Sequence, residues 1–204
     1  MKKKKTKKGA GMSTNRRNII VGGVLVAALG ALAFMVITLP GRNGGTQSNG
    51  YVFEMKGADL AIDKVVSKQE VIDELGNNAK GVDDVEKSGV LSFYGNKGQT
   101  ATYNFTTASG GRASVEVDVM IYQSQDAYDE AKVFAGTGSA GKVGNMEIRF
   151  LPAVTLGYDR EYALLVTKDL KSYKFSIMQS SKKIEINELT AQDILKKLIA
   201  KARL

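Results

Sequence analysis

One stretch limits the architecture of this chain more than any other feature: residues 19–39 (IIVGGVLVAALGALAFMVITL) contain no charged side chain. At about 1.5 Å per residue, a helix of this length spans roughly the 30 Å hydrocarbon core of a bilayer. Pro40 and Gly41 follow and would end such a helix. The sequence therefore predicts one transmembrane helix over residues 19–39, with the lipid bilayer as its partner.

The charges around this stretch predict its orientation. Arg42 stands alone just after it, whereas residues 1–18 contain eight basic side chains and no acid: Lys2, Lys3, Lys4, Lys5, Lys7, Lys8, Arg16 and Arg17. Because basic flanks stay on the cytoplasmic side, residues 1–18 are expected to form a cytoplasmic tail near anionic inner-leaflet lipid. The expected localisation is the cell membrane, in a single pass, with the C-terminal part outside the cytoplasm.

A cleaved signal peptide is the alternative interpretation. Signal peptides have apolar regions of about 7–15 residues that end at a small-residue site, and Ala31-Leu32-Ala33 is such a triplet. Residues 34–39 extend the apolar run beyond it. We therefore interpret the stretch as an uncleaved anchor.

The basic balance of the whole chain belongs to the tail. Of 29 basic residues, eight lie in residues 1–18, which leaves 21 to match the 21 acidic ones. A region with no net charge generates no long-range field that gathers phosphates. We therefore expect no nucleic-acid partner.

Residues 40–56 are expected to be a flexible linker, because residues 41–50 (GRNGGTQSNG) offer no apolar side chain to bury. Residues 57–204 then have the size of one domain with a single core. Ser67 and Glu70 have capping-box spacing, which predicts a helix that ends near Leu75 with Gly76 as its stop.

Hydrophobic periodicity predicts the remaining elements. Strands are expected at residues 90–94, 99–107 and 113–122, a helix from Ser124 to about residue 135, strands at 143–151, 160–167 and 172–178, an edge strand at 184–186, and a helix from Thr190 onward. In the third strand, valines alternate with Ser114, Glu116 and Asp118, the pattern of a sheet with one face in water. The last helix carries an apolar stripe of Ile194, Leu195, Leu198, Ile199 and Ala202, so we expect it to pack on the sheet rather than on a membrane surface.

This order predicts an α+β fold in which an antiparallel sheet packs against helices. Together with Val66-Ser-Lys-Gln-Glu-Val71 and Leu75-Gly76, it resembles uncharacterised surface lipoproteins of actinobacteria that share the PsbP-like fold. The resemblance covers residues 58–204 and implies that fold and an extracytoplasmic setting, but no site residue. The chain departs from those lipoproteins in its anchorage, because it has no cysteine to carry a lipid.

The chain contains no cysteine and no histidine. This excludes disulfides and thiolate catalysis, and it removes the commonest acid–base group near neutral pH and the commonest metal ligand. We therefore expect no catalytic, metal-binding or cofactor-binding residue and no enzymatic activity, while the ligand-binding residues stay unknown.

Several motifs suggest chemistry, and each has a simpler interpretation. Residues 136–142 (GTGSAGK) fit the start of a phosphate-binding P-loop, but Val143 replaces the Ser or Thr that holds magnesium, and the expected order is helix then strand. Asp159 and Glu161 could pair as in glycosidases, but nothing in the sequence supplies a pocket. We interpret the first motif as a loop and the second as a charged turn.

The other candidates are Asp126, Asp129 and Glu130 on early helix turns, Asp83 and Asp84 in a loop, the sequon at Asn104, and the tyrosines Tyr94, Tyr103, Tyr122, Tyr158, Tyr162 and Tyr173. We interpret the helix acids as partners of the helix dipole and the two loop aspartates as solvated charge. The sequon lies inside a predicted strand, and we expect the tyrosines to lie in the core or at its rim.

The expected function is that of a membrane-anchored, non-catalytic binding or interaction module with an envelope or surface partner. One alternative is a carrier or sensor for a small apolar or cell-envelope ligand, which requires an apolar cavity of several hundred Å³. The other is a cell-wall hydrolase, which requires two carboxylates in one cleft.

Overall fold

The computed structural model describes residues 58–93, 95–135 and 138–204. The predicted tail, transmembrane helix and linker, residues 1–56, lie outside the described residues. Among those that are described, no helix has the length and apolarity needed to cross a bilayer.

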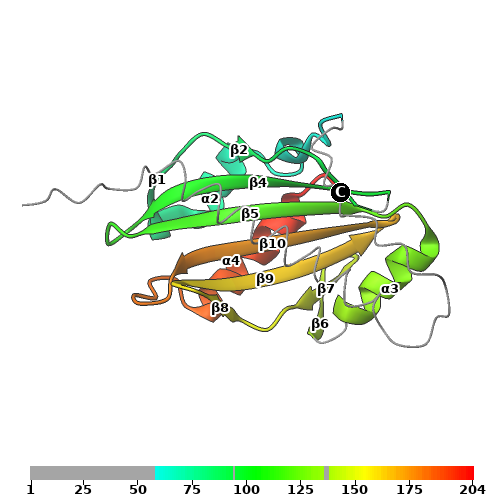
Figure 1. Cartoon of the computed structure of the whole chain (residues 1–204). Coiled ribbons are helices and arrows are strands. Elements are labelled where there is room, and N and C mark those ends of the chain that lie inside the picture. The colour runs from blue at the N-terminus through cyan, green and yellow to red at the C-terminus, as the bar shows by residue number, and fades with distance from the viewer. Residues whose placement is uncertain (1–57, 94, 136–137) are drawn as a thin grey trace, which may run out of the picture. The chain divides into compact units, whose positions relative to one another are not determined.

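Ten strands form one antiparallel sheet in the order β1-β4-β5-β10-β9-β7-β6, with β2 and β3 paired to β4 and β8 paired to β9 (Figure 1). Four long strands make its centre: β4 (Asn96–Thr107), β5 (Arg112–Ile121), β9 (Asp159–Lys168) and β10 (Lys171–Ser180). The shorter strands are β1 (Ala79–Val82), β2 (Glu86–Lys87), β3 (Leu91–Phe93), β6 (Ser139–Val143), β7 (Met146–Phe150) and β8 (Val154–Leu156).

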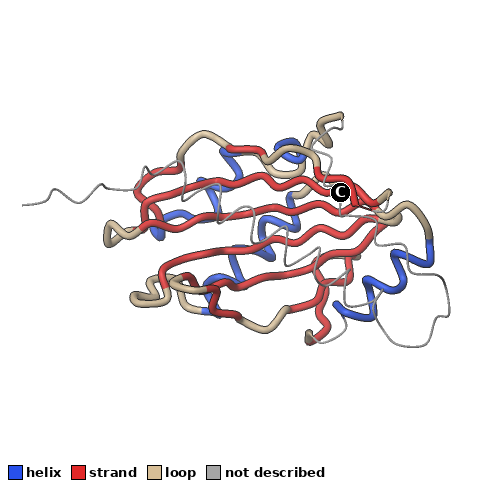
Figure 2. The backbone as a smooth tube through the Cα atoms, viewed as in Figure 1, coloured by secondary structure: helices blue, strands red, loops and turns tan. Residues whose placement is uncertain are grey.

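Two helices and a 3₁₀ turn lie on one face of this sheet. They are η1 (Ile62–Lys64), α2 (Lys68–Leu75) and α4 (Glu188–Lys201), and a second 3₁₀ turn, η2 (Gly76–Asn78), follows α2. Figures 1 and 2 show α2 and α4 behind the strands and α3 (Gln125–Ala135) beside the β6–β7 end of the sheet. The antiparallel α+β architecture predicted from the sequence is confirmed.

The core lies between the sheet and helices α2 and α4. Strand alternation sends one row of side chains from each long strand into it, and the pairings Tyr103–Val115–Ile177–Tyr162 place a continuous apolar row across β4, β5, β10 and β9. A parallel row joins Ala101, Val117, Phe175 and Leu164. All eight side chains are buried, so this layer is filled by protein.

Helix α2 begins as its sequence predicts. The Ser67 hydroxyl accepts a hydrogen bond from the Glu70 backbone N–H, and the Glu70 carboxylate accepts one from the Ser67 backbone N–H. Arg203 donates two further bonds to Glu70, at 2.9 and 3.0 Å. These contacts, led by Arg203, lower the pKa of Glu70 to about 2. The cap of α2 is thus tied to the C-terminal end of the chain.

Helix α4 packs on the sheet, as predicted, and also on α2. Four residues of the predicted stripe, Ile194, Leu195, Leu198 and Ile199, are buried, whereas Ala202 is the C-cap and is half-buried. This contradicts the alternative of a membrane-surface helix. The predicted start is wrong by two residues, because Asn187 is the cap and its side chain accepts a hydrogen bond from the Thr190 N–H at 3.0 Å.

The strand predictions fail mainly at short elements. Residues 143–151 are not one strand: β6 and β7 form a hairpin across Gly144 and Asn145, and Gly144 has φ +56°. Strands β1, β2 and β8 were not expected, and residues 184–186 form no strand. Gln179 explains the last difference, because its side-chain oxygen accepts the backbone N–H groups of Glu185 and Ile186 that a ladder would otherwise use.

Candidate functional site

The face of the sheet opposite α2 and α4 carries the polar side chains of the long strands. Strand pairing joins Thr100, Asp118, Lys174, Leu165 and Arg149 into one row across five strands. The neighbouring row contains Thr102, Glu116, Ser176 and Ala163. We call this surface the polar face.

The prediction that this face lies in water is wrong at its centre. Only 7% of Glu116 and 4% of Asp118 is exposed, and Ser176, Lys174 and Glu161 are also buried. Asp118 of β5 and Glu161 of β9 are shielded from solvent, and Lys174 between them supplies the counter-charge.

Lys174 holds this buried cluster together. Its Nζ lies 2.9 Å from Glu161 Oε1 and 3.2 Å from Asp118 Oδ2, and the second contact is an ion pair without hydrogen-bond alignment. Asp118 also accepts a hydrogen bond from the Thr100 hydroxyl. Burial would lower the pKa of Lys174, but the charges of Asp118 and Glu161 outweigh it and raise that pKa. Lys174 is therefore a fixed cation at the centre of the polar face.

Glu116 is the member of the cluster without a cation of its own. Burial, reinforced by the negative charge of Asp118, raises its pKa to about 8, although Lys174 opposes the shift. The Ser114 hydroxyl lies 3.5 Å from its Oε1. Glu116 is therefore mostly protonated at neutral pH, which leaves Asp118 and Glu161 as two negative charges around the single positive charge of Lys174.

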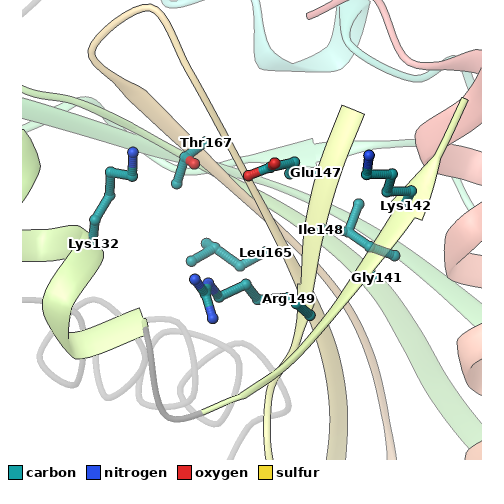
Figure 3. A pocket seen from close by; sticks show the side chains of 9 residues that line it. Lys132, Gly141, Lys142, Glu147, Ile148, Arg149, Leu165 and Thr167 are labelled. Carbon is teal, nitrogen blue, oxygen red and sulfur yellow. The ribbon is translucent and has the colours of Figure 1, made fainter. Parts of the chain in front are cut away.

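A hollow of about 510 Å³ lies where the polar face reaches β9, β7 and β6. We call it the edge hollow. Its lining consists of Lys132, Ala140, Gly141, Lys142, Glu147, Ile148, Arg149, Leu165 and Thr167. In Figure 3, Lys132 of α3 stands on one side and Lys142 of β6 on the other, with Arg149 and Leu165 between them.

The charges that line the edge hollow are predominantly positive. Lys132, Lys142 and Arg149 face a single acid, Glu147, and all four side chains are exposed. None of these four side chains takes part in an ion pair within the described part of the chain. Lys132 instead stacks over the Tyr128 ring, with 5.2 Å between its Nζ and the ring centroid.

A second hollow, of about 340 Å³, lies at the other end of β4, β5 and β10 and is lined by residues that include Arg112, Lys183 and Glu185. Two of its charged side chains already have partners. Lys183 lies 3.4 Å from Glu185 and donates a 2.7 Å hydrogen bond to Ser109. Bonds from Ser109 and Thr107, with Lys183, lower the pKa of Glu185 to about 2. This hollow therefore offers a ligand fewer free charges.

The structure separates the residues that the sequence singled out. Lys142 lies on β6, after α3, so the helix-then-strand order that argues against a P-loop is confirmed. The interpretation of residues 136–142 as a loop is wrong from Ser139 onward, because these residues pair with β7 as strand β6, while Gly136 and Thr137 lie outside the described residues. Glu161 is not part of a solvated turn, since it contacts Lys174 within the sheet. Arg160 instead donates a hydrogen bond to the Thr155 hydroxyl at 3.1 Å.

The remaining candidates mostly follow their simpler interpretations. Asp84 pairs with Lys68 at 2.8 Å, and Asp129 accepts a hydrogen bond from Gln125 within α3. Asn104 lies inside β4. Tyr103, Tyr162 and Tyr173 are buried in the core, and Tyr122 bonds Ser172 through its hydroxyl. Tyr158 is largely exposed, and Tyr94 lies outside the described residues.

The buried cluster and the edge hollow were not predicted. Lys174 alternates with Ser172 and Ser176 in the sequence, which is a signal for a polar face, but the register that opposes it to Asp118 comes from pairing between distant strands. Gly144-Asn145 between two short apolar runs is a two-residue hairpin signal, and it would have brought Lys142 opposite Glu147.

Comparison with known proteins gives little further information. No family model matches the chain, and no curated protein matches it. Among solved structures it is similar to the extracellular domain of PknH from Mycobacterium tuberculosis, at 10% identity and a TM-score of 0.35, over 71% of this chain and 97% of that one. A likeness this weak supports no argument about function, and the resemblance to actinobacterial surface lipoproteins stays an expectation.

Proposed function

We propose that this chain is a membrane-anchored, extracytoplasmic binding module that acts without catalysis. The anchor and its orientation rest on the sequence of residues 1–42. The observation that carries the binding role is the edge hollow, whose volume of about 510 Å³ lies within the usual range for ligand sites, roughly 300–1,000 Å³.

The position of this hollow favours surface binding over transport in an interior cavity. A carrier for a wholly apolar ligand would hold it between the sheet and its helices, where Tyr103, Phe175 and Leu195 are fully buried and fill the space. The edge hollow lies on the opposite face and has charged walls. A sensor of a small envelope ligand remains the second candidate, favoured by the volume of the hollow alone.

A carboxylate-based hydrolase has less support. Such enzymes place two carboxylates about 5–10 Å apart on either side of the substrate. Asp118 and Glu161 approach each other only through Lys174, which lies between them. Neither lines the edge hollow, where Glu147 is the one carboxylate among the described lining residues.

Lysine footprinting on intact cells tests the binding role. A membrane-impermeant acetylating reagent modifies accessible lysines, and mass spectrometry of the full chain reports the extent at each one. We expect Lys132 and Lys142 to be modified several-fold less on cells than in the purified chain, because a bound ligand covers them. The exposed Lys80 and Lys97, which are remote from the hollow in the sheet order, serve as controls.

If each of the four lysines is modified to the same extent on cells as in the purified chain, no ligand is bound at this site. A ligand or partner that does protect the hollow can then be identified by crosslinking on the same cells, followed by mass spectrometry of what co-purifies with the chain.

A further inference from the structure

We propose that the edge hollow binds an amphipathic anion: a ligand with one phosphate or carboxylate head group joined to a small apolar part. This inference rests on the proposed binding function and names the class of ligand. The site consists of Lys132, Lys142 and Arg149 for the head group and Leu165 and Ala140 for the apolar part.

The anionic half follows from the uncompensated charge. Three cations and one acid leave the hollow with two excess positive charges, whereas most lysines elsewhere on the domain pair with nearby acids, such as Lys87 with Asp59 and Asp63 or Lys197 with Asp193. Cations gathered in a concave site attract an anion more strongly than isolated surface charges do. Arg149 can bind a phosphate or carboxylate through two hydrogen bonds at once.

The cations come from three separate elements. Lys132 is on α3, Lys142 on β6 and Arg149 on β7, and Figure 3 shows them on different sides of the hollow. Arg149 is opposite Leu165 in the sheet, and Lys142 is opposite Glu147. A head group between these side chains would therefore meet cations from more than one direction, as an oxyanion requires.

The apolar part of the ligand is inferred from the apolar side chains that form the floor of the hollow. Half-buried Leu165 of β9 and exposed Ala140 of β6 both line the hollow. A small apolar group on this floor would bury hydrocarbon surface, at about 25 cal/mol per Å² removed from water. A bare inorganic anion would gain nothing from this part of the site.

The site differs from a nucleotide-binding P-loop although it includes Lys142. A P-loop holds phosphates with backbone N–H groups at the start of a helix, whereas here the residues after Ser139 form β6. Val143 also supplies no hydroxyl for magnesium. We therefore expect no saturable binding of Mg-ATP.

Titration calorimetry on the full chain in lipid nanodiscs, with empty nanodiscs as the blank, tests the proposal. The probes are 1-naphthyl phosphate, inorganic phosphate, neutral 1-naphthol and Mg-ATP. We expect saturable binding of 1-naphthyl phosphate that weakens as sodium chloride is added, because salt screens exposed charges. Inorganic phosphate and 1-naphthol should each bind at least about tenfold more weakly, since each offers half of the contacts.

A charge-matched pair of variants locates the site. The double change Lys132→Gln and Lys142→Gln is expected to weaken 1-naphthyl phosphate binding by about tenfold or more. The double change Lys80→Gln and Lys97→Gln removes the same charge from exposed positions outside the hollow and should change the affinity by less than about twofold. Arg149→Gln alone should resemble the first pair.

Each contrary result has a defined meaning. Inorganic phosphate that binds as tightly as 1-naphthyl phosphate would remove the apolar half of the proposal, and 1-naphthol that binds equally well would remove the anionic half. Saturable Mg-ATP binding that is lost in Lys142→Ala would show a nucleotide site instead. If no probe binds while Lys132 and Lys142 are protected on cells, this ligand class is wrong and the binding module stands.

Discussion

Glu116 is an acid on the polar face that is buried rather than exposed to solvent. Its carboxyl group is buried between β4 and β10, beside Ser176 and near Asp118, while Lys174 is engaged by two other acids. Sequence alternation predicted the direction in which Glu116 points. Its burial could not be predicted, because that depends on the pairing of β5 with β10, which are about fifty residues apart in the chain.

Glu116→Gln should change the pH dependence of stability. Because folding raises the pKa of Glu116 from 4.5 to about 8, the folded protein holds this proton more tightly than the unfolded chain does. The resulting stabilisation is fully present below pH 4.5 and is lost as the pH rises through about 8. The glutamine variant lacks this loss.

Urea unfolding of a fragment of residues 57–204 measures the effect. We expect the variant and the parent to be similar at pH 4.5, and the variant to be more stable at pH 9 by at least about 1.4 kcal/mol, the value of one pKa unit. A difference between the two proteins that stays constant from pH 4.5 to 9 would show that Glu116 ionises as it does in an unfolded chain.

The packing of helix α4 could be predicted from its sequence. The apolar stripe was enough to predict that it packs on the sheet, since a five-residue stripe and an apolar sheet face must each be covered. The hairpin of β6 and β7 was missed for the opposite reason. Its strands have five residues each, too few for period-two alternation to separate them, and only the Gly144-Asn145 turn marks the boundary.

Removal of two buried leucines from α4 tests its place in the core. Leu195 and Leu198 are fully buried, and each Leu→Ala change in a core costs about 2–5 kcal/mol. Because the total stability of a domain is typically about 5–15 kcal/mol, Leu195→Ala with Leu198→Ala should unfold or nearly unfold the 57–204 fragment.

Leu189→Ala is the matched control on the same helix, because 79% of Leu189 is exposed. We expect it to change the free energy of unfolding by less than about 0.5 kcal/mol. Circular dichroism during heating distinguishes the variants. An unchanged melting temperature in the double variant would mean that α4 does not hold the core together.

At the scale of the whole molecule, the fold class and the long elements follow from periodicity, capping and turn residues. The site does not follow, because the edge hollow joins residues of α3, β6, β7 and β9 whose approach depends on the sheet order. Lys142 belongs to a P-loop-like sequence motif whose helix-then-strand order differs from that of a P-loop, whereas no sequence motif marks Lys132 or Arg149. The residues of such a site are brought together by pairing between strands that lie far apart in the chain, and the pattern within one strand does not say which strand pairs with it.

The central claim is that the domain stands outside the cytoplasm on a single membrane anchor, and cysteine labelling tests it most directly. The chain has no cysteine, so a membrane-impermeant maleimide can react only with one introduced by design. Leu189→Cys places a thiol on the exposed side of α4, and Thr6→Cys places one in the basic tail. On intact cells we expect Leu189→Cys to be labelled and Thr6→Cys to be labelled only after the membrane is opened. Labelling of Thr6→Cys but not Leu189→Cys on intact cells would contradict the account.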